Sequence, residues 1–305
     1  MVAGTRRRVG ERIGHVAIVL IMALFALSVL LPFMRHISLS VSTPVAVVTG
    51  GMYLLPQPGE VTLETWKRIF RQRSTVEAYY WSLYRTAIGV ALSVFIMGLT
   101  AYPLSKKYLP FRRSYTIFVI ITMYTTGGFI PMFLIVRGLG LYNTMGALWL
   151  PLMMNGFWML LTRNFFMTLP EELTESARID GAGELRTFVQ LILPLSKPII
   201  AVLSLWMFVF HWNAWFDILI FISRGKIFVP QLLGRIIADV NEASRGGIAS
   251  EIRLAQLLEE TQDKQYTAET IRSGILLYSL IPIILVYPFL QKYFAKGILI
   301  GSLKG

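Results

Sequence analysis

Six stretches of the sequence are long and apolar enough to cross a lipid bilayer as helices. A helix that spans the hydrocarbon core needs about 20 mainly apolar residues, and none of the six contains Asp, Glu, Lys or Arg. Because lipid offers the backbone no hydrogen-bond partners, we expect each to be helical. The predicted fold class is therefore all-α, a polytopic membrane protein with six transmembrane helices. The six windows are Val16–Phe33, Ala87–Leu104, Tyr115–Val136, Thr144–Thr162, Ile199–Phe216 and Gly274–Leu290.

The composition argues against the main soluble classes. Charged side chains make up 15% of the 305 residues, whereas a soluble domain carries about a quarter. This disfavours a soluble enzyme, a disordered protein and a nucleic-acid module. The net charge of +12 fits an anionic membrane surface as well as nucleic acid. The positions of the charges along the chain distinguish these two partners. The chain has no cysteine, which removes disulfides, thiolate chemistry and Cys-ligated metals.

Basic residues alternate between the two sides of the predicted spans. Cytoplasmic loops of membrane proteins carry an excess of Lys and Arg. The loop after the third window has only Arg137, which indicates that both termini are cytoplasmic and that no nucleic-acid partner is needed to explain the charge. The predicted cytoplasmic residues are Arg6, Arg7, Arg8, Arg12, Lys106, Lys107, Arg112, Arg113, Arg163, Arg178, Arg186, Lys197, Lys292, Lys296 and Lys304.

The first window has two interpretations. It follows Arg6, Arg7 and Arg8, as the apolar part of a signal peptide would. Its apolar part is longer than that of a typical signal peptide, and no clear small-x-small cleavage site follows Phe33. We therefore expect a retained span.

The chain then divides into a cytoplasmic N-terminus (1–15), a transmembrane domain (16–294) and a cytoplasmic tail (295–305). Two long loops, near 35–83 and 222–273, are expected outside. The first of these loops is predicted to be irregular and to be followed by an amphipathic helix around Leu63–Phe70. The second has helical apolar spacing, as in Leu232, Leu233, Ile236 and Ile237, and again in Leu254, Leu257 and Leu258. Its two helices either lie on the membrane or form a docking surface for an extracytoplasmic partner.

The loop at 168–194 predicts a helix, a tight turn and a second helix. Thr168 and Glu171 fit a capping box at the start of the first helix. Gly181 follows Asp180 and can adopt the left-handed conformation that ends a helix. The second helix should run from about Gly183 to Leu193 and end at Pro194. An ordinary interfacial hairpin between spans would show the same pattern.

This loop resembles the EAA loop in membrane subunits of bacterial ABC importers. That motif reads Glu-Ala-Ala, three residues, Gly, nine residues, Ile-x-Leu-Pro. The chain has Glu175-Ser176-Ala177, then Gly181, and after nine residues Leu191-Ile192-Leu193-Pro194. Ser176 stands where the motif has Ala, and Leu191 where it has Ile. Asp180, Ala182, Phe188 and Pro198 are also typical of the carbohydrate-importing branch.

Two further stretches extend the resemblance over most of the chain. Residues 206–217 contain the Trp212-Asn213 pair, which is similar to the fifth span of sugar permeases. Residues 287–297 and 301–305 resemble the end of the subgroup that imports complex oligosaccharides, where two different permeases pair. The chain looks like the second of these, akin to the second permease of maltose importers. An acidic oligosaccharide such as alginate is a plausible substrate within this subgroup.

The resemblance implies the fold of a type I ABC importer transmembrane domain in the bacterial inner membrane. It implies four kinds of partner: a second permease, two ATP-binding subunits, an extracytoplasmic solute-binding protein and the oligosaccharide. Mg-ATP would be bound by the ATPase subunits, and this chain would hold no cofactor and catalyse nothing. In agreement, no Gly-x-x-x-x-Gly-Lys-Ser/Thr motif is present. The residues implied in coupling to the ATPase are Glu175, Ser176, Ala177, Asp180, Gly181, Ala182 and Phe188.

Aromatic and polar residues within the spans are candidates for the substrate path. Sugars are bound by aromatic faces and by side chains that offer both donors and acceptors. Hydrogen bonds between helices would equally explain Asn155 and Asn213, and an interfacial belt would explain the aromatic residues of span five. The residues from Tyr124 to Gly128 form either a local break or a Pro131 kink. The predicted path residues are Tyr124, Thr125, Asn155, Trp158, Trp212, Asn213 and Asp217.

Two other functions would show different sequence features. A self-sufficient secondary transporter or channel would show an ionisable residue in mid-span and broken helices in paired positions. A membrane-embedded enzyme would need convergent acid, base or metal-binding residues. The three histidines, His15, His36 and His211, are well separated in sequence and predict no metal cluster.

Overall fold

A computed structural model describes residues 9–49, 54–56, 59–125, 127–235 and 267–302 of the chain. The elements of this part are helical, and its one β feature is an isolated bridge between Ser42 and Val61. The chain forms two compact units. Unit 1 comprises Met1–Arg73 and Leu233–Leu280, and unit 2 comprises Ser74–Leu232 and Ile281–Gly305.

Unit 1 contains α1 (Val9–Ser40), α2 (Pro44–Thr49), α3 (Glu64–Arg71) and the start of α16 (Ala268–Ser302). The apolar window of α1 has no buried side chain, as suits a helix that faces lipid or another membrane subunit. In contrast, α3 packs on α16. Phe70 meets Tyr278 edge to face with 5.3 Å between ring centroids, and Ile69 lies against Gly274.

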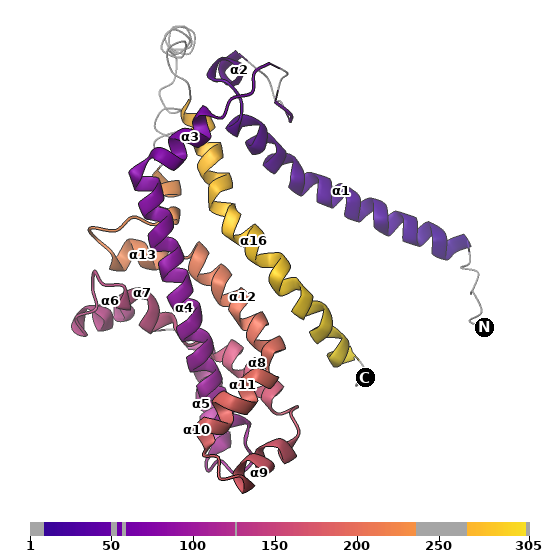
Figure 1. Cartoon of the computed structure of the whole chain (residues 1–305), viewed down its shortest axis with the longest axis vertical. Coiled ribbons are helices and arrows are strands. Elements are labelled where there is room, and N and C mark those ends of the chain that lie inside the picture. The colour runs from indigo at the N-terminus through magenta and orange to yellow at the C-terminus, as the bar shows by residue number, and fades with distance from the viewer. Residues whose placement is uncertain (1–8, 50–53, 57–58, 126, 236–266, 303–305) are drawn as a thin grey trace. The chain divides into compact units, whose positions relative to one another are not determined.

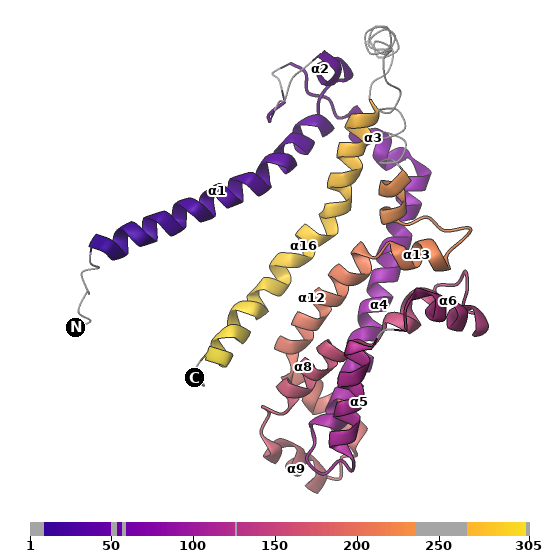
Figure 2. The same ribbon diagram turned by 180° about the vertical axis from the view of Figure 1, so that it is seen from behind.

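Unit 2 is built around α4 (Arg73–Ser105), which lies beside α12 (Lys197–Asn213) in Figures 1 and 2. Small residues on one face of α4 allow this close approach, as at helix interfaces in membranes. A Cβ atom on Gly89 would lie 2.7 Å from Nε2 of the buried His211. One turn further, Ser93 Oγ lies 3.4 Å from the same nitrogen. Farther along, Met97, Ala101 and Tyr102 join the apolar core of the unit.

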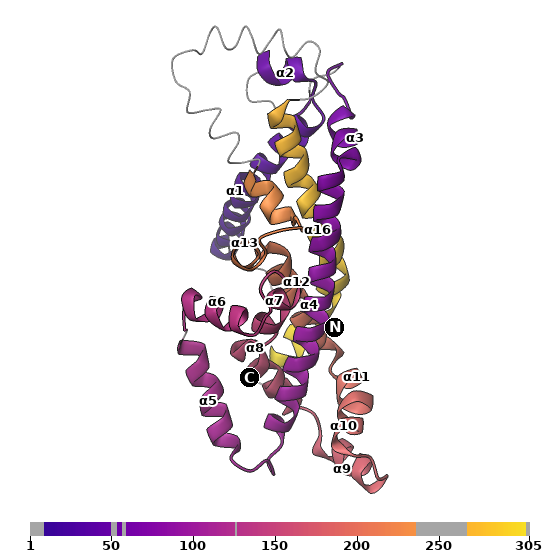
Figure 3. The same cartoon turned by 90° about the vertical axis from the view of Figure 1, so that its left-hand side faces the viewer.

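Three of the predicted spans are broken. Helices α5 (Arg112–Tyr124) and α6 (Phe129–Gly138) meet at 113°, with Gly128 at φ +79° (Figure 3). Of the two interpretations of this segment, the structure shows the local break and not the proline kink, because α5 ends before Gly128 and Pro131 lies inside α6. The window Thr144–Thr162 contains α7 (Gly146–Trp149), a 3₁₀ turn (Leu150–Leu152) and the start of α8 (Gly156–Phe166).

The third break separates α12 from α13 (Phe216–Phe221), where Ala214 is extended at ψ 119°. The windows Thr144–Thr162 and Ile199–Phe216 are therefore not single helices, contrary to our expectation. Apolarity measures how well a segment suits lipid, but it does not detect residues such as Gly128 and Asn155 that favour a stop or a cap.

By length and apolarity, three helices in the described part of the chain could cross a membrane: Gly14–Ser40, Arg73–Ser105 and Glu269–Pro288. The number rises to five if two bent pairs each form one span. These pairs are α5 with α6, and Glu184–Leu195 with Lys197–Asn213. Six spans therefore remain a prediction.

The loops differ in part from their expected form. The helix expected around Leu63–Phe70 is confirmed as α3. However, α1 continues to Ser40 and α4 begins at Arg73, so much of the predicted outer loop 35–83 is helical. Leu232 and Leu233 lie in a helical stretch, 229–235. The rest of the apolar spacing in the second loop, from Ile236 to Leu258, lies outside the described residues.

The contact between Gly89 and His211 predicts a site that does not tolerate a side chain. Gly89→Val should lower the stability of the chain by about 1–3 kcal/mol, because the added methyl groups overlap a buried ring. Gly138→Val is the matched control, because a Cβ at that helical position meets nothing within 4 Å. Thermal unfolding of the two variants in detergent checks this, and equal midpoints would contradict it.

Candidate functional site: a helical hairpin and an aromatic groove

The segment at 168–194 folds as a helical hairpin. It comprises α9 (Glu171–Ile179), a turn, α10 (Glu184–Thr187), a π-helical turn (Phe188–Ile192) and α11 (Leu193–Leu195). Gly181 has φ +75°, and the amide of Ala182 donates to the carbonyl of Ala177 at 2.9 Å. This closure is typical of a helix that ends in a left-handed residue, so the predicted turn at Gly181 is confirmed.

The predicted capping box is wrong. Helix α9 starts after Pro170 and has no side-chain cap, while the hydroxyl of Thr168 donates to the Phe165 carbonyl at the end of α8. Glu171 instead pairs with Lys107 at 2.8 Å, and the hydrogen bond from Lys107 lowers the pKa of Glu171. The Thr168 hydroxyl therefore donates to a carbonyl at the end of α8 and does not accept from an amide at the start of α9.

Pro194 does not end the second helix as predicted. It lies in the first turn of α11, and the helix continues to Leu195. Proline is tolerated in the first turn of a helical segment, where its missing N–H is not needed. The π-helical turn just before it starts a new hydrogen-bonding register, so Pro194 begins a short segment and does not break one.

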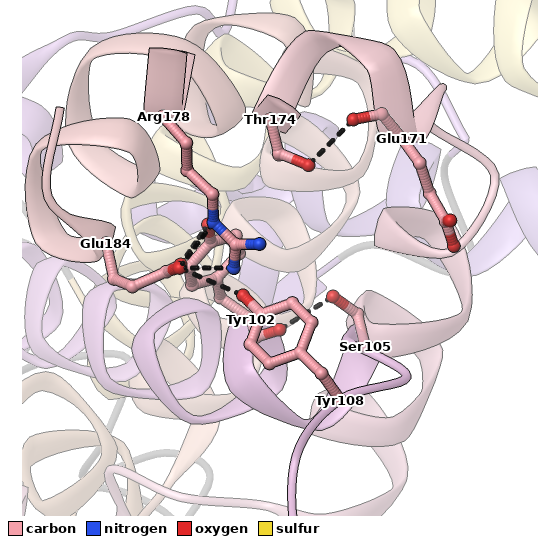
Figure 4. A network of polar contacts seen from close by, with 7 residues as sticks. All are labelled: Tyr102, Ser105, Tyr108, Glu171, Thr174, Arg178 and Glu184. Carbon is pink, nitrogen blue, oxygen red and sulfur yellow. Dashed lines mark hydrogen bonds and ion pairs between the residues drawn. The ribbon is translucent and has the colours of Figure 1, made fainter. Parts of the chain in front are cut away.

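The carboxylate of Glu184 ties the hairpin to α4 and to the loop that follows it (Figure 4). It accepts hydrogen bonds from the hydroxyls of Tyr102 at 2.8 Å and Tyr108 at 3.0 Å. Arg178, on α9, donates to it through Nη2 at 2.6 Å and Nε at 3.2 Å. We call these four residues the Glu184 latch.

The latch also sets the electrostatics of its members. The guanidinium of Arg178 lies 4.4 Å from the ring centroid of Tyr108. Its hydrogen bond to Glu184 raises the pKa of Arg178. Burial, and then the hydrogen bond to Glu184, raises the pKa of Tyr108. The sequence reasoning missed the latch. The sequence did contain a signal for the latch, because Arg178 and Glu184 have opposite charges and lie on either side of the turn at Gly181.

The predicted coupling residues differ in their exposure. Glu175, Ser176, Asp180 and Gly181 are exposed, whereas Ala177 and Ala182 are half-buried. In contrast, Phe188 is fully buried, and its ring lies 5.3 Å from that of Tyr102 and close to Gly98. Phe188 therefore anchors the hairpin to α4.

Near the turn, Ile179 is 86% exposed, and Leu185 is exposed as well. The sequence reasoning had not singled out these two apolar side chains.

An aromatic groove of about 840 Å³ lies at the break between α12 and α13. Among the predicted path residues, Asn213 and Asp217 line it. Trp158 does not line it, but its ring lies 4.9 Å from that of Trp206, which does. The lining residues are Phe129, Leu152, Trp206, Val209, Phe210, Asn213, Ala214, Trp215, Phe216 and Asp217.

The other predicted path residues do not line this groove. Trp212 is buried and packs on Phe208 and Tyr79. Asn155 caps α8, since its Oδ1 accepts from the amide of Trp158 at 3.2 Å. Tyr124, which is 85% exposed, and Thr125 lie at the α5–α6 break.

Asp217 forms an ion pair with Arg85 of α4, a residue that the sequence reasoning missed. Arg85 lies just before the window Ala87–Leu104, and Asp217 just after Ile199–Phe216. With the predicted topology, both positions fall at the outer ends of their spans, which was a usable signal. Among the described residues, no group of three or more His, Asp or Glu could hold a metal ion.

Comparison with known proteins places these features in context. A family model described as "Binding-protein-dependent transport system inner membrane component" matches residues 94–300. The chain is 36% identical over 282 residues to the polygalacturonan/rhamnogalacturonan transport system permease protein YtcP of Bacillus subtilis (strain 168), covering 92% of this chain and 95% of the relative. It is 35% identical over 279 residues to Protein LplC of the same organism, covering 90% of each.

A solved structure also matches. It comes from a bacterial ABC transporter involved in the import of the acidic polysaccharide alginate. The match has a TM-score of 0.80 and 29% sequence identity, and it covers 96% of this chain and 100% of that one.

The latch predicts that one carboxylate holds the hairpin to α4. Glu184→Ala should raise the hydrogen-exchange rate of the hairpin amides about fivefold, because it removes charged hydrogen bonds in a half-exposed setting, worth about 1 kcal/mol. Glu172→Ala is the control, because Glu172 is also an exposed acid at the start of a hairpin helix. Unchanged exchange in Glu184→Ala would show that the latch does not hold the hairpin.

Proposed function

The chain belongs to the family of binding-protein-dependent transport system inner membrane components, and on this premise we propose that it is the membrane-spanning permease subunit of a carbohydrate ABC importer. It is a non-catalytic transport component. Its partners are a second permease, two ATPase subunits that bind ATP with Mg, and an extracytoplasmic solute-binding protein. The observation that carries the proposal is the hairpin with its left-handed turn at Gly181.

The proposed topology has six spans in the inner membrane and both termini in the cytoplasm. The transmembrane domain covers 16–294, between short cytoplasmic segments at 1–15 and 295–305. The bent pair of α5 and α6, the α7–α8 segment and α12 supply the spans that are not single long helices. The distribution of Lys and Arg supports placing the hairpin on the cytoplasmic side.

The hairpin is proposed to couple transport to ATP hydrolysis. Near its turn, it exposes the apolar Ile179 together with Glu175, Ser176 and Asp180. An exposed apolar side chain beside polar groups suits a surface that a partner covers. On the other side, Phe188 and the Glu184 latch fix the hairpin to α4, so a displacement at the turn would move α4 as a rigid body.

The groove is proposed to form part of the path of an acidic oligosaccharide. Its tryptophan and phenylalanine rings suit the apolar faces of sugar rings, and Asn213 offers both a donor and an acceptor. Polygalacturonan and alginate, named for a relative and a structural neighbour, are both polymers of uronic acids. The shared chemistry of these two supports an acidic sugar as substrate.

The turn gives the first test. Gly181→Val should abolish uptake and weaken binding of the ATPase subunits, because a β-branched side chain is strained at positive φ. Gly183→Val is the matched control, since Gly183 has φ −70° and a Cβ there meets nothing within 4 Å. Uptake and co-purification of the ATPase are measured in membranes containing equal amounts of each variant. Full coupling by Gly181→Val would refute the assignment.

The two asparagines of the predicted path give the second test. Asn213→Ala should lower uptake at least severalfold with little change in thermal stability, because its side chain faces the groove. Asn155→Ala should instead lower stability by about 1 kcal/mol, the usual cost of losing a helix cap. Transport assays and unfolding midpoints on both variants separate these effects. Normal uptake by Asn213→Ala would remove Asn213 from the sugar path.

A further inference from the structure

Arg85 is a buried charge beside the aromatic groove. Its side chain is 1% exposed, and a buried charge is costly unless it is paired and hydrogen-bonded. Arg85 is paired by two groups from the break between α12 and α13, although its Nε and Oδ1 of Asp217 are buried without a hydrogen-bond partner among the described residues. Nη1 donates to the carbonyl of Ala214 at 2.9 Å, and Nη2 pairs with Oδ2 of Asp217. The planar guanidinium suits two acceptors held at fixed positions.

Both bonds act on the segment that forms one wall of the groove. Helix α12 ends at Asn213, and α13 starts at Phe216, so the carbonyl of Ala214 lies in the gap between them. Asn213, Ala214, Trp215, Phe216 and Asp217 all line the groove. Arg85 thus holds the backbone between the asparagine and the tryptophan that face the cavity.

The ion pair also determines the charge of the groove. Among the described residues that line it, Asp217 is the only charged one, and its side chain is 13% exposed. An unpaired carboxylate here would repel an anion in the groove, because such interactions are only weakly screened in a partly buried site. The guanidinium of Arg85 neutralises it from behind the wall.

We propose that Arg85 is a positioning residue that fixes the α12–α13 break and masks the charge of Asp217, so that the groove admits an acidic sugar. This inference deepens the proposed function and rests on it for the identity of the sugar. The geometry and charge of the groove can nevertheless be measured without any sugar.

The absence of cysteine from the chain allows a direct measurement of this charge. Ala214→Cys would place the only thiol of this chain in the groove, and it leaves the carbonyl that Arg85 binds in place. The rates of modification by an anionic reagent, sulfonatoethyl methanethiosulfonate, and a cationic one, trimethylammonioethyl methanethiosulfonate, are then compared. The ratio of the anionic to the cationic rate reports the local potential, which a purely structural role of Arg85 would not shift.

Each variant has its own expected ratio. Arg85→Met leaves Asp217 unpaired and should lower the ratio about tenfold, whereas Asp217→Asn leaves Arg85 unpaired and should raise it by a similar factor. The double variant Arg85→Met/Asp217→Asn should return it to within about twofold of the starting value. Lys226→Met is the matched control, because it removes a positive charge that lies over Trp81 and does not line the groove.

An unchanged ratio in both single variants, or an equal shift in Lys226→Met, would overturn the proposal. If the Arg85→Met chain fails to assemble, the direction in which Asp217→Asn shifts the ratio of modification rates still tests the proposal. A failure of the proposed function is seen separately. An acidic oligosaccharide delivered by the binding protein would then not slow the labelling of the thiol in the chain that carries Ala214→Cys alone, in which Asn213, Arg85 and Asp217 are all unchanged.

Discussion

The close packing of α4 against its neighbours underlies both functional features of unit 2. In this helix Gly89 and Ser93 lie against His211, and on another face Gly98 lies against Phe188. Small residues let helices approach until dispersion forces act over a wide area, which matters in lipid because the hydrophobic effect does not drive helices together there. In the first half of α4, Arg85 holds the groove wall, and near the C-terminal end Tyr102 binds the hairpin. The groove and the hairpin are therefore connected through one rigid helix.

Much of this arrangement could be predicted from the sequence, for identifiable reasons. The apolar windows located the long helices, and the glycine after Asp180 located the turn, because each depends on local chemistry. The capping box failed because Thr168 had two possible partners, and only the fold determined which one was in reach. The Glu184 latch was missed for a similar reason, since Tyr102 lies far from Glu184 in sequence.

The predicted sugar-path residues show the same limit. Asn155 and Asn213 look alike in sequence, since each is a polar residue in an apolar window. In the structure, Asn155 caps a helix, while Asn213 faces the groove. A secondary transporter would show an ionisable residue in mid-span and broken helices in paired positions. Broken helices are present, but Arg85 and Asp217 lie at the ends of their predicted spans, where they pair with each other and Arg85 binds a backbone carbonyl. The family membership identifies the chain as a permease subunit.

The bend after the hairpin has a mechanical consequence. The segment Glu184–Leu195 meets Lys197–Asn213 at 84°, and the buried Ser196 lies between them. Two rigid helical segments joined at nearly a right angle form an angled lever, in which a force on one arm rotates the other arm about the joint. A sideways load on the short arm would therefore tilt the long arm and swing its far end, where Asn213 lies, through a larger arc than the load itself travels.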